Sequence, residues 1–208
     1  MEKFFDSENP LMIFLSRLVD LAVLNLLTVC TSMLIVTAGG ALTAMNNVLL
    51  HLLRRDETYV TKMFWTSFKK NFRQGIPEGL LVLVTALITF VDMWALHGSD
   101  SKAATLLMIV ITIIAMFLVA TFVYMFALQS RYENTVLGTI TNAFRLAVGN
   151  LPRTVGMIII WLVWGLILVY LHKAAPAIFM IYGLTLPGYL CAMLYNGVFY
   201  NLETEGEK

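Results

Sequence analysis

Charged side chains are scarce in this sequence. Asp, Glu, Lys and Arg make up 13% of the 208 residues, whereas hydrophobic residues make up 59%. Soluble domains carry about 25% charged residues, so this composition excludes an ordinary soluble fold. The formal net charge of +1 argues against a nucleic-acid partner, because proteins that bind nucleic acids concentrate basic side chains on one face. We therefore expect most of the chain to lie in the lipid bilayer, and we expect no nucleic-acid partner.

Catalytic and metal-binding signatures are also missing. The two cysteines, Cys30 and Cys191, lie inside apolar runs without C-x-x-C spacing, so we expect them to pack as small hydrophobic side chains. The three histidines are too widely spread to suggest a common metal site. The sequence has no phosphate-binding P-loop, no zinc-binding H-E-x-x-H helix and no G-x-S-x-G nucleophile turn. It predicts neither an enzyme nor a cofactor.

Long apolar runs are what the sequence has in abundance. A helix needs about 20 mostly apolar residues to cross a bilayer. Five segments meet that requirement: residues 18–37, 76–96, 103–128, 154–171 and 177–199. The predicted fold is all-α. It is a single membrane domain, residues 1–208, formed by a polytopic helix bundle of about five transmembrane helices with two or three amphipathic interfacial helices.

Lys and Arg residues indicate how this bundle is oriented, because they are retained on the cytoplasmic side. Six lie between residues 54 and 73 and three between residues 131 and 153, whereas the opposite loops hold only Lys102 and Lys173. We expect the two basic segments and the C-terminus to be cytoplasmic. With five spans, the N-terminus is then external.

Residues 11–53 combine the first span with a shorter apolar segment, residues 41–53. At the helical rise per residue the shorter segment covers only about 20 Å, and it carries the polar residues Thr43, Asn46, Asn47 and His51. We expect an interfacial or re-entrant helix whose polar groups face protein or water. If the segment instead completes a return crossing, the N-terminus lies inside.

The two basic segments predict amphipathic helices. Apolar residues recur at intervals of four in each: Val60, Phe64, Phe68 and Phe72 in the first, and Val136, Ile140, Phe144 and Val148 in the second. That spacing places them on one face, which is typical of a helix in the headgroup plane. The similarity of the two segments predicts a weak parallel repeat, residues 57–128 and 133–199. Each copy is an interfacial helix followed by a transmembrane hairpin.

Three segments in the first part of the chain are similar to a known family. They are LNLL at residues 24–27, IVTAGGALTA at residues 35–44 and FWTSFKKNFRQ at residues 64–74. On these residues the chain resembles the YesL-like family of bacterial membrane proteins, a domain with no established biochemical function. Members usually carry Pro where this chain has Leu34. The resemblance implies a bacterial cell membrane and the company of carbohydrate ABC importers, glycoside hydrolases and sugar-responsive regulators.

We therefore interpret the chain as a non-catalytic accessory or assembly subunit of a carbohydrate (oligosaccharide) ABC importer, in contact with lipid and with the importer's permease or ATPase subunits. The candidate partner contacts lie on the two basic helices: Phe64, Phe68, Lys69, Lys70, Phe72, Arg73, Glu133, Gly138, Phe144 and Arg145. In the second helix Glu133 and Gly138, with the Leu-Pro pair at 151–152, are faintly similar to the coupling loop of importer permeases.

Four polar or aromatic residues at membrane depth are the remaining candidates: Asp20, Asn25, Asp92 and Trp161. Buried ionisable residues are costly and mark functional sites by default. The simpler expectations are an ion pair between Asp20 and Arg17, an interfacial anchor at Asp92, a helix-bridging amide at Asn25 and aromatic packing at Trp161. An independent transporter using these four residues is the alternative function, and a membrane sensor or regulator is a third.

Four glycines complete the expectations from the sequence. Gly75 and Gly79, or Gly39 with Gly40, lack side chains and so permit close contact between helices.

Overall fold

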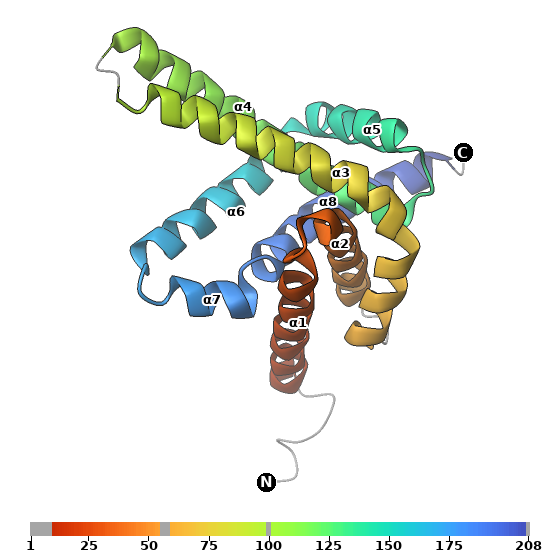
Figure 1. The fold of residues 1–208 in the computed structure, drawn as a ribbon. Coiled ribbons are helices and arrows are strands. Elements are labelled where there is room, and N and C mark those ends of the chain that lie inside the picture. The colour runs from red at the N-terminus through yellow and green to blue at the C-terminus, as the bar shows by residue number, and fades with distance from the viewer. Residues whose placement is uncertain (1–9, 55–58, 99–100, 207–208) are drawn as a thin grey trace.

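The protein consists of helices in the computed structural model, which describes residues 10–54, 59–98 and 101–206 (Figure 1). The elements are α1 (Pro10–Ser32), the 3-10 helix η2 (Ile35–Thr37), α2 (Ala38–Arg54), α3 (Val60–Leu96), α4 (Lys102–Arg131), α5 (Val136–Gly149), α6 (Leu151–Tyr170), α7 (Ala175–Tyr182) and α8 (Thr185–Gly206). Within these ranges four helices, α1, α3, α4 and α6, are long and apolar enough to cross a membrane, and α7 with α8 would form a fifth span. The predicted all-α, polytopic membrane architecture is confirmed.

α2 returns alongside α1 and is largely enclosed by the rest of the chain. Eleven of its 17 residues are buried, so the predicted short segment at 41–53 is longer at both ends and packed inside the protein. Its polar side chains face protein, as expected. Asn46 Nδ2 donates to the Leu42 carbonyl at 2.8 Å, and Asn46 Oδ1 accepts a hydrogen bond from the Tyr195 hydroxyl at 2.8 Å.

α2 and α3 cross through the four glycines. A Cβ atom on Gly39 would overlap the Gly75 carbonyl oxygen, and a Cβ atom on Gly75 would overlap the backbone of Gly40. Only residues without a side chain allow two helix backbones to approach this closely. On the other side of the crossing, a Cβ atom on Gly40 would lie 3.5 Å from the Phe68 ring. The glycines therefore determine where α3 lies on α2.

α3 is one continuous helix of 37 residues, whereas the sequence predicts an interfacial helix and a separate span. Pro77 lies inside it. A proline lacks the N–H that would bond the carbonyl four residues earlier, so it bends a helix that packing holds together instead of ending it. Figure 1 shows the first part of α3 beside α2 and the second part running in another direction beside α4. Residues 57 and 58, where the first predicted repeat begins, lie outside the described residues.

In the second half of the chain, the helices that correspond to the continuous α3 are separate. α5 ends at Gly149, and α6 begins at Leu151 with Pro152 in its first turn, where the missing N–H of a proline costs no hydrogen bond. α7 and α8 form a helix pair bent by 48°. The predicted span at residues 177–199 is therefore interrupted near its beginning.

Asn25 of α1 satisfies the backbone groups that this interruption exposes. Its Nδ2 donates to the carbonyls of Phe179 and Met180, both at 2.9 Å. Its Oδ1 accepts from the backbone N–H groups of Leu184 at 2.8 Å and Thr185 at 3.2 Å. Unpaired backbone groups cost several kcal/mol each in a lipid environment, about what one lost hydrogen bond costs in an apolar medium. The predicted helix-bridging amide is thus a cap for a broken span.

The core lies where α1, α3, α4 and α8 pack around α2. Its largest fully buried aromatic side chains are Tyr124, Tyr195, Phe64 and Phe199. The outer faces of α3, α4 and α6, by contrast, expose many large apolar side chains, which include Leu87, Phe90, Leu106, Ile113, Leu166 and Val169. An apolar surface of this extent is suited to lipid and not to water, as expected for a multi-pass membrane protein.

Candidate functional site

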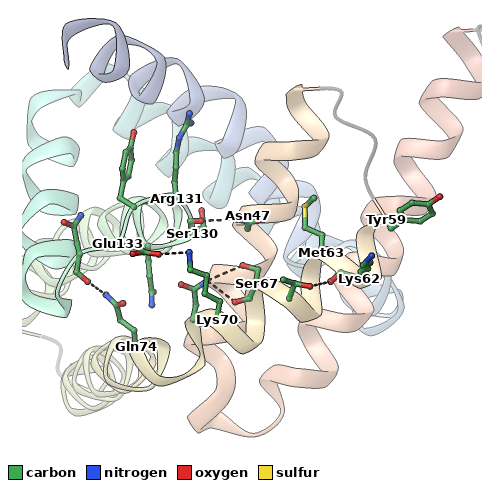
Figure 2. A pocket seen from close by; sticks show the side chains of 15 residues that line it. Asn47, Tyr59, Lys62, Met63, Ser67, Lys70, Gln74, Ser130, Arg131 and Glu133 are labelled. Carbon is green, nitrogen blue, oxygen red and sulfur yellow. Dashed lines mark hydrogen bonds and ion pairs between the residues drawn. The ribbon is translucent and has the colours of Figure 1, made fainter. Parts of the chain in front are cut away.

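A polar cavity of about 640 Å³ lies between α2, the first part of α3 and the C-terminal end of α4 (Figure 2). Polar side chains dominate its lining: Asn47, Lys62, Thr66, Ser67, Lys70, Asn71, Gln74, Gln129, Ser130, Arg131, Glu133 and Asn134, beside Tyr59, Met63 and Tyr132. The volume is within the range of about 300–1,000 Å³ that is typical of small-molecule sites. We call this feature the polar cavity.

α3 forms one wall of the polar cavity because its polar residues recur at helical spacing. Ser67, Asn71 and Gln74 are separated by four and three residues, so they share one face of the helix. Asn71 Nδ2 donates to the Ser67 carbonyl at 2.9 Å and lies 3.3 Å from Ser67 Oγ. Both residues are buried. These local bonds hold the Asn71 amide in place along the wall.

The opposite wall is formed where α4 is tied to α2. Thr43 Oγ1 donates to Gln129 Oε1 at 2.9 Å, and Asn47 Nδ2 donates to the Ser130 carbonyl at 3.0 Å. Gln129 Nε2 is buried and has no hydrogen-bond partner among the described residues. A buried donor without a partner costs about 1–3 kcal/mol. The side-chain amide of Gln129, which lines the cavity, therefore makes fewer hydrogen bonds than it can.

An ion pair and a hydrogen bond close the rim between α3 and the segment that follows α4. Lys70 Nζ lies 2.8 Å from Glu133 Oε1, and Gln74 Nε2 donates to the Asn134 carbonyl at 2.7 Å; both contacts are visible in Figure 2. The hydrogen bond from Lys70 and its positive charge hold the pKa of the Glu133 carboxyl below its ordinary value. Because the two side chains are 65% and 85% exposed, the pair positions the rim but adds little stability.

The candidate partner contacts separate into three groups. Lys70 and Glu133 are brought together at the cavity rim. Phe64 is fully buried, and Phe68 and Phe72 are half-buried in a ladder of ring contacts with centroid distances of 6.1 and 5.5 Å. The face of α3 that carries these phenylalanines therefore packs against the protein. The sequence predicts instead that this face lies at the membrane surface. Lys69 and Arg73 remain exposed.

On α5 the apolar residues stay at the surface. Phe144 and Val148 are exposed beside the exposed Arg145, while Ala143 and Ala147 face the protein. This arrangement suits a helix in the headgroup plane. Gly138 lies in the first turn of α5, where its backbone N–H donates to the Thr135 hydroxyl at 3.2 Å. The side chain of Thr135 thereby caps the N-terminus of α5.

The four candidates at membrane depth do not line one cavity. Asn25 is used by the broken span. Asp20 is half-buried on α1, one turn after Arg17, whose charge acts on its carboxylate. Asp92 lines a cavity between α3 and α4, and Trp161 lines a separate apolar cavity between α4 and α6. Within the described part of the chain, no three His, Cys, Asp or Glu side chains gather as metal ligands would.

Sequence reasoning missed Glu78. Its side chain is 0% exposed, and neither carboxylate oxygen has a hydrogen-bond partner among the described residues. The signal was present, since Glu78 lies inside the predicted span 76–96 and an ionisable residue within a span is a functional candidate by default.

Residues 21–93 match the model of a family described as "Protein of unknown function, DUF624". The match runs from α1 through most of α3, about a third of the chain, and encloses all three segments that resemble the YesL-like family. No curated protein and no solved structure gave a match. Several residues in the matched segments have a structural role, because Asn25 caps the broken span, Gly39 and Gly40 contact α3, and Ser67 and Asn71 line the polar cavity.

Proposed function

We propose that this protein is a non-catalytic accessory or assembly subunit of a carbohydrate ABC importer, and that a permease or ATPase subunit docks at the rim of the polar cavity. The resemblance to the YesL-like family is the sole support for a carbohydrate importer as the partner. The docking surface is supported by the Lys70–Glu133 contact. The first part of α3 and the segment around Glu133 were each predicted as a partner surface. The contact places them side by side on one face of the protein.

The charge at this face supports its orientation and its kind of partner. Lys62, Lys69 and Arg73 are exposed on α3, and Arg145 is exposed on α5. Basic residues of this density are retained in the cytoplasm, where an ATPase subunit lies. They would steer an acidic surface of that subunit toward the cavity. The exposed Phe144 of α5 would supply an aromatic anchor, since such residues often dominate interface energies.

The test is purification of tagged protein from its own membranes in mild detergent, with mass spectrometry of the subunits that follow. We expect permease and ATPase subunits with the wild type. Lys70→Glu and Glu133→Lys each place like charges across the rim and should reduce recovery of those subunits by about tenfold, which corresponds to about 1.4 kcal/mol of binding energy. The double variant restores the ion pair and should recover much of the loss.

Lys102→Glu is the matched control, because it reverses an exposed lysine at the other end of α4. Its recovery of subunits should equal that of the wild type. The proposal fails if the wild type purifies without importer subunits, or if the rim variants and the control behave alike.

The polar cavity itself favours a second candidate, a membrane sensor for a small polar ligand. Polar side chains, Gln129 and Asn71 among them, line a volume of suitable size. A ligand that binds only the folded state raises the unfolding temperature. Thermal unfolding with a panel of oligosaccharides would identify such a ligand, and Gln129→Leu should abolish the shift. No shift with any sugar leaves the accessory role as the better account.

A further inference from the structure

Polar residues follow one face of α3 along nearly its whole length. Ser67, Asn71, Gln74, Glu78, Thr85, Thr89 and Asp92 are the members of this stripe. At 3.6 residues per turn their directions fall within roughly 60° of one another. Between Glu78 and Thr85 this face is apolar, and Leu81 is among its residues. A stripe of this kind in a candidate span is unexpected, because lipid provides no partners for polar groups.

The stripe faces α4 at both ends. At one end Ser67, Asn71 and Gln74 line the polar cavity together with Gln129 of α4. At the other end Thr85, Thr89 and Asp92 line a second cavity, of about 300 Å³, together with residues of α4 that include Ala115 and Leu118. Glu78 lies between these two sets on the same face. Helical spacing therefore places Glu78 on the side of α3 that faces α4.

No charged side chain among the described residues is bonded to Glu78. It is fully buried, and its carboxylate oxygens have no partner among the described residues. Removing an ionised carboxylate from water without a partner costs several kcal/mol. On α2 the contacts with α3 are made through Gly39 and Gly40. On α4, Phe122 and Met125 lie between Leu118 and Gln129 on the same face of the helix. None of these side chains carries a charge.

The helices packed against α3 carry other titratable or charged residues, none of which is hydrogen-bonded to Glu78: Arg17, Asp20 and Cys30 on α1, His51 and Arg54 on α2, Lys102, Tyr124 and Arg131 on α4, and Arg145 on α5. On α3 itself the nearest charged residue is Arg73, which is exposed and five residues from Glu78, on a different side of the helix. A proton is the smallest cation that could make Glu78 neutral.

We propose that Glu78 is a proton-binding site within the membrane, and that protons reach it from the polar cavity along Gln74 and Asn71. Gln74 precedes Glu78 by one helical turn, and Asn71 precedes Gln74 by three residues. Their amide groups can hydrogen-bond the waters that carry a proton inward. The apolar gap after Glu78 covers about 10 Å at helical rise and blocks the same movement from the Asp92 side.

The site is tested by infrared spectroscopy of the full chain in lipid bilayers. A protonated carboxyl has a carbonyl stretch distinct from that of a carboxylate, and the stretch moves when its proton is replaced by deuterium. The difference between the wild type and Glu78→Gln isolates the signal of this residue. We expect the band at neutral pH, its reversible loss as pH is raised, and its shift after transfer to heavy water.

Access is tested by the rate of that shift. The variant Asn71→Leu with Gln74→Leu should slow deuteration at least about tenfold, as a barrier higher by about 1.4 kcal/mol would. Thr85→Val, on the far side of the apolar gap, should leave the rate unchanged. Slowing by Thr85→Val without slowing by the cavity variant would overturn the proposed route.

Two spectral results would overturn the binding site itself. Absence of the band at neutral pH would mean that Glu78 is ionised and paired. A band that neither deuterates nor disappears while the protein stays folded would mean a permanently neutral, structural carboxyl. If Glu78→Gln does not fold, the wild type is treated with a hydrophobic carbodiimide, which adds only to protonated carboxyls in apolar surroundings. Modification located at Glu78 by mass spectrometry then supports the proposal, and an unmodified Glu78 refutes it.

Discussion

The two regions predicted as repeats, residues 57–128 and 133–199, are attached to the α1–α2 hairpin by different chemistry. In the first region α3 stays continuous through Pro77 and crosses α2 backbone against backbone at four glycines. In the second region the last span is interrupted, and the amide of Asn25 bonds the exposed backbone groups. A proline is therefore not enough to end a helix, as Pro77 shows. The break between α7 and α8 is accommodated because Asn25 of the neighbouring helix bonds the backbone groups there.

The same lesson applies to the two predicted interfacial helices. Both have apolar residues at intervals of four, yet Phe64 of α3 is buried whereas Phe144 of α5 is exposed. The difference lies in the neighbour. The side-chain-free surface of Gly40 accepts the phenylalanine ladder of α3, and α5 meets the protein through its small residues Ala143 and Ala147.

The largest effect should come from filling the glycine crossing. In Gly39→Ala the added Cβ overlaps the backbone of Gly75, which cannot move as a flexible side chain could, so we expect a loss of about 3 kcal/mol or more. In Gly149→Ala, at the end of α5, nothing lies within 4 Å of the added Cβ, and removing a helical glycine should stabilise by up to about 1 kcal/mol. Thermal unfolding in detergent micelles measures both. Equal effects would show that the crossing does not hold the first region.

The next effect should come from Asn25→Leu, which removes the cap of the second region. The carbonyl of Met180 and the backbone N–H of Leu184 lose the hydrogen bonds that Asn25 makes, and we expect about 2–4 kcal/mol of destabilisation. Hydrogen exchange should accelerate at the amides of Leu184 and Thr185 and remain unchanged in α3. The control Leu26→Ala alters an exposed neighbour on α1 and should cost less than about 1 kcal/mol. Protection that is lost equally in α3 would contradict a local role for Asn25.

The smallest effect should come from the contact between the regions, Lys70 with Glu133. The pKa of Glu133 is lowered in the folded protein, so the contribution of this pair is present above the unfolded pKa of about 4.3 and is lost as pH falls through the lower folded value. The unfolding midpoints of the wild type and Glu133→Gln should differ slightly at pH 7 and converge on acidification. A difference between the two midpoints that grows on acidification would contradict a lowered pKa for Glu133. Such a result would require the folded protein to stabilise the protonated carboxyl.

Much of the fold and part of the site could be predicted from local pattern. The apolar runs identified the spanning helices, although the structure shows that the last span is interrupted. The polar residues of the segment at 41–53 were correctly expected to face protein or water. Lys70 and Glu133 were each selected from the sequence, but their contact was not. The burial of Phe64 and the single helix through Pro77 could not be predicted, because both depend on Gly39 and Gly40 lying opposite α3.

The sequence by itself determined that the protein is all-helical and where its apolar spans lie, because lipid requires each segment to satisfy its own backbone and to expose apolar side chains over a fixed length. Only the tertiary structure decided which residues meet. The glycine crossing, the Asn25 cap, the polar cavity and the burial of Glu78 each join residues that are distant in the sequence. A contact of this kind depends on how two helices pack against each other, and the pattern within either helix does not contain that information.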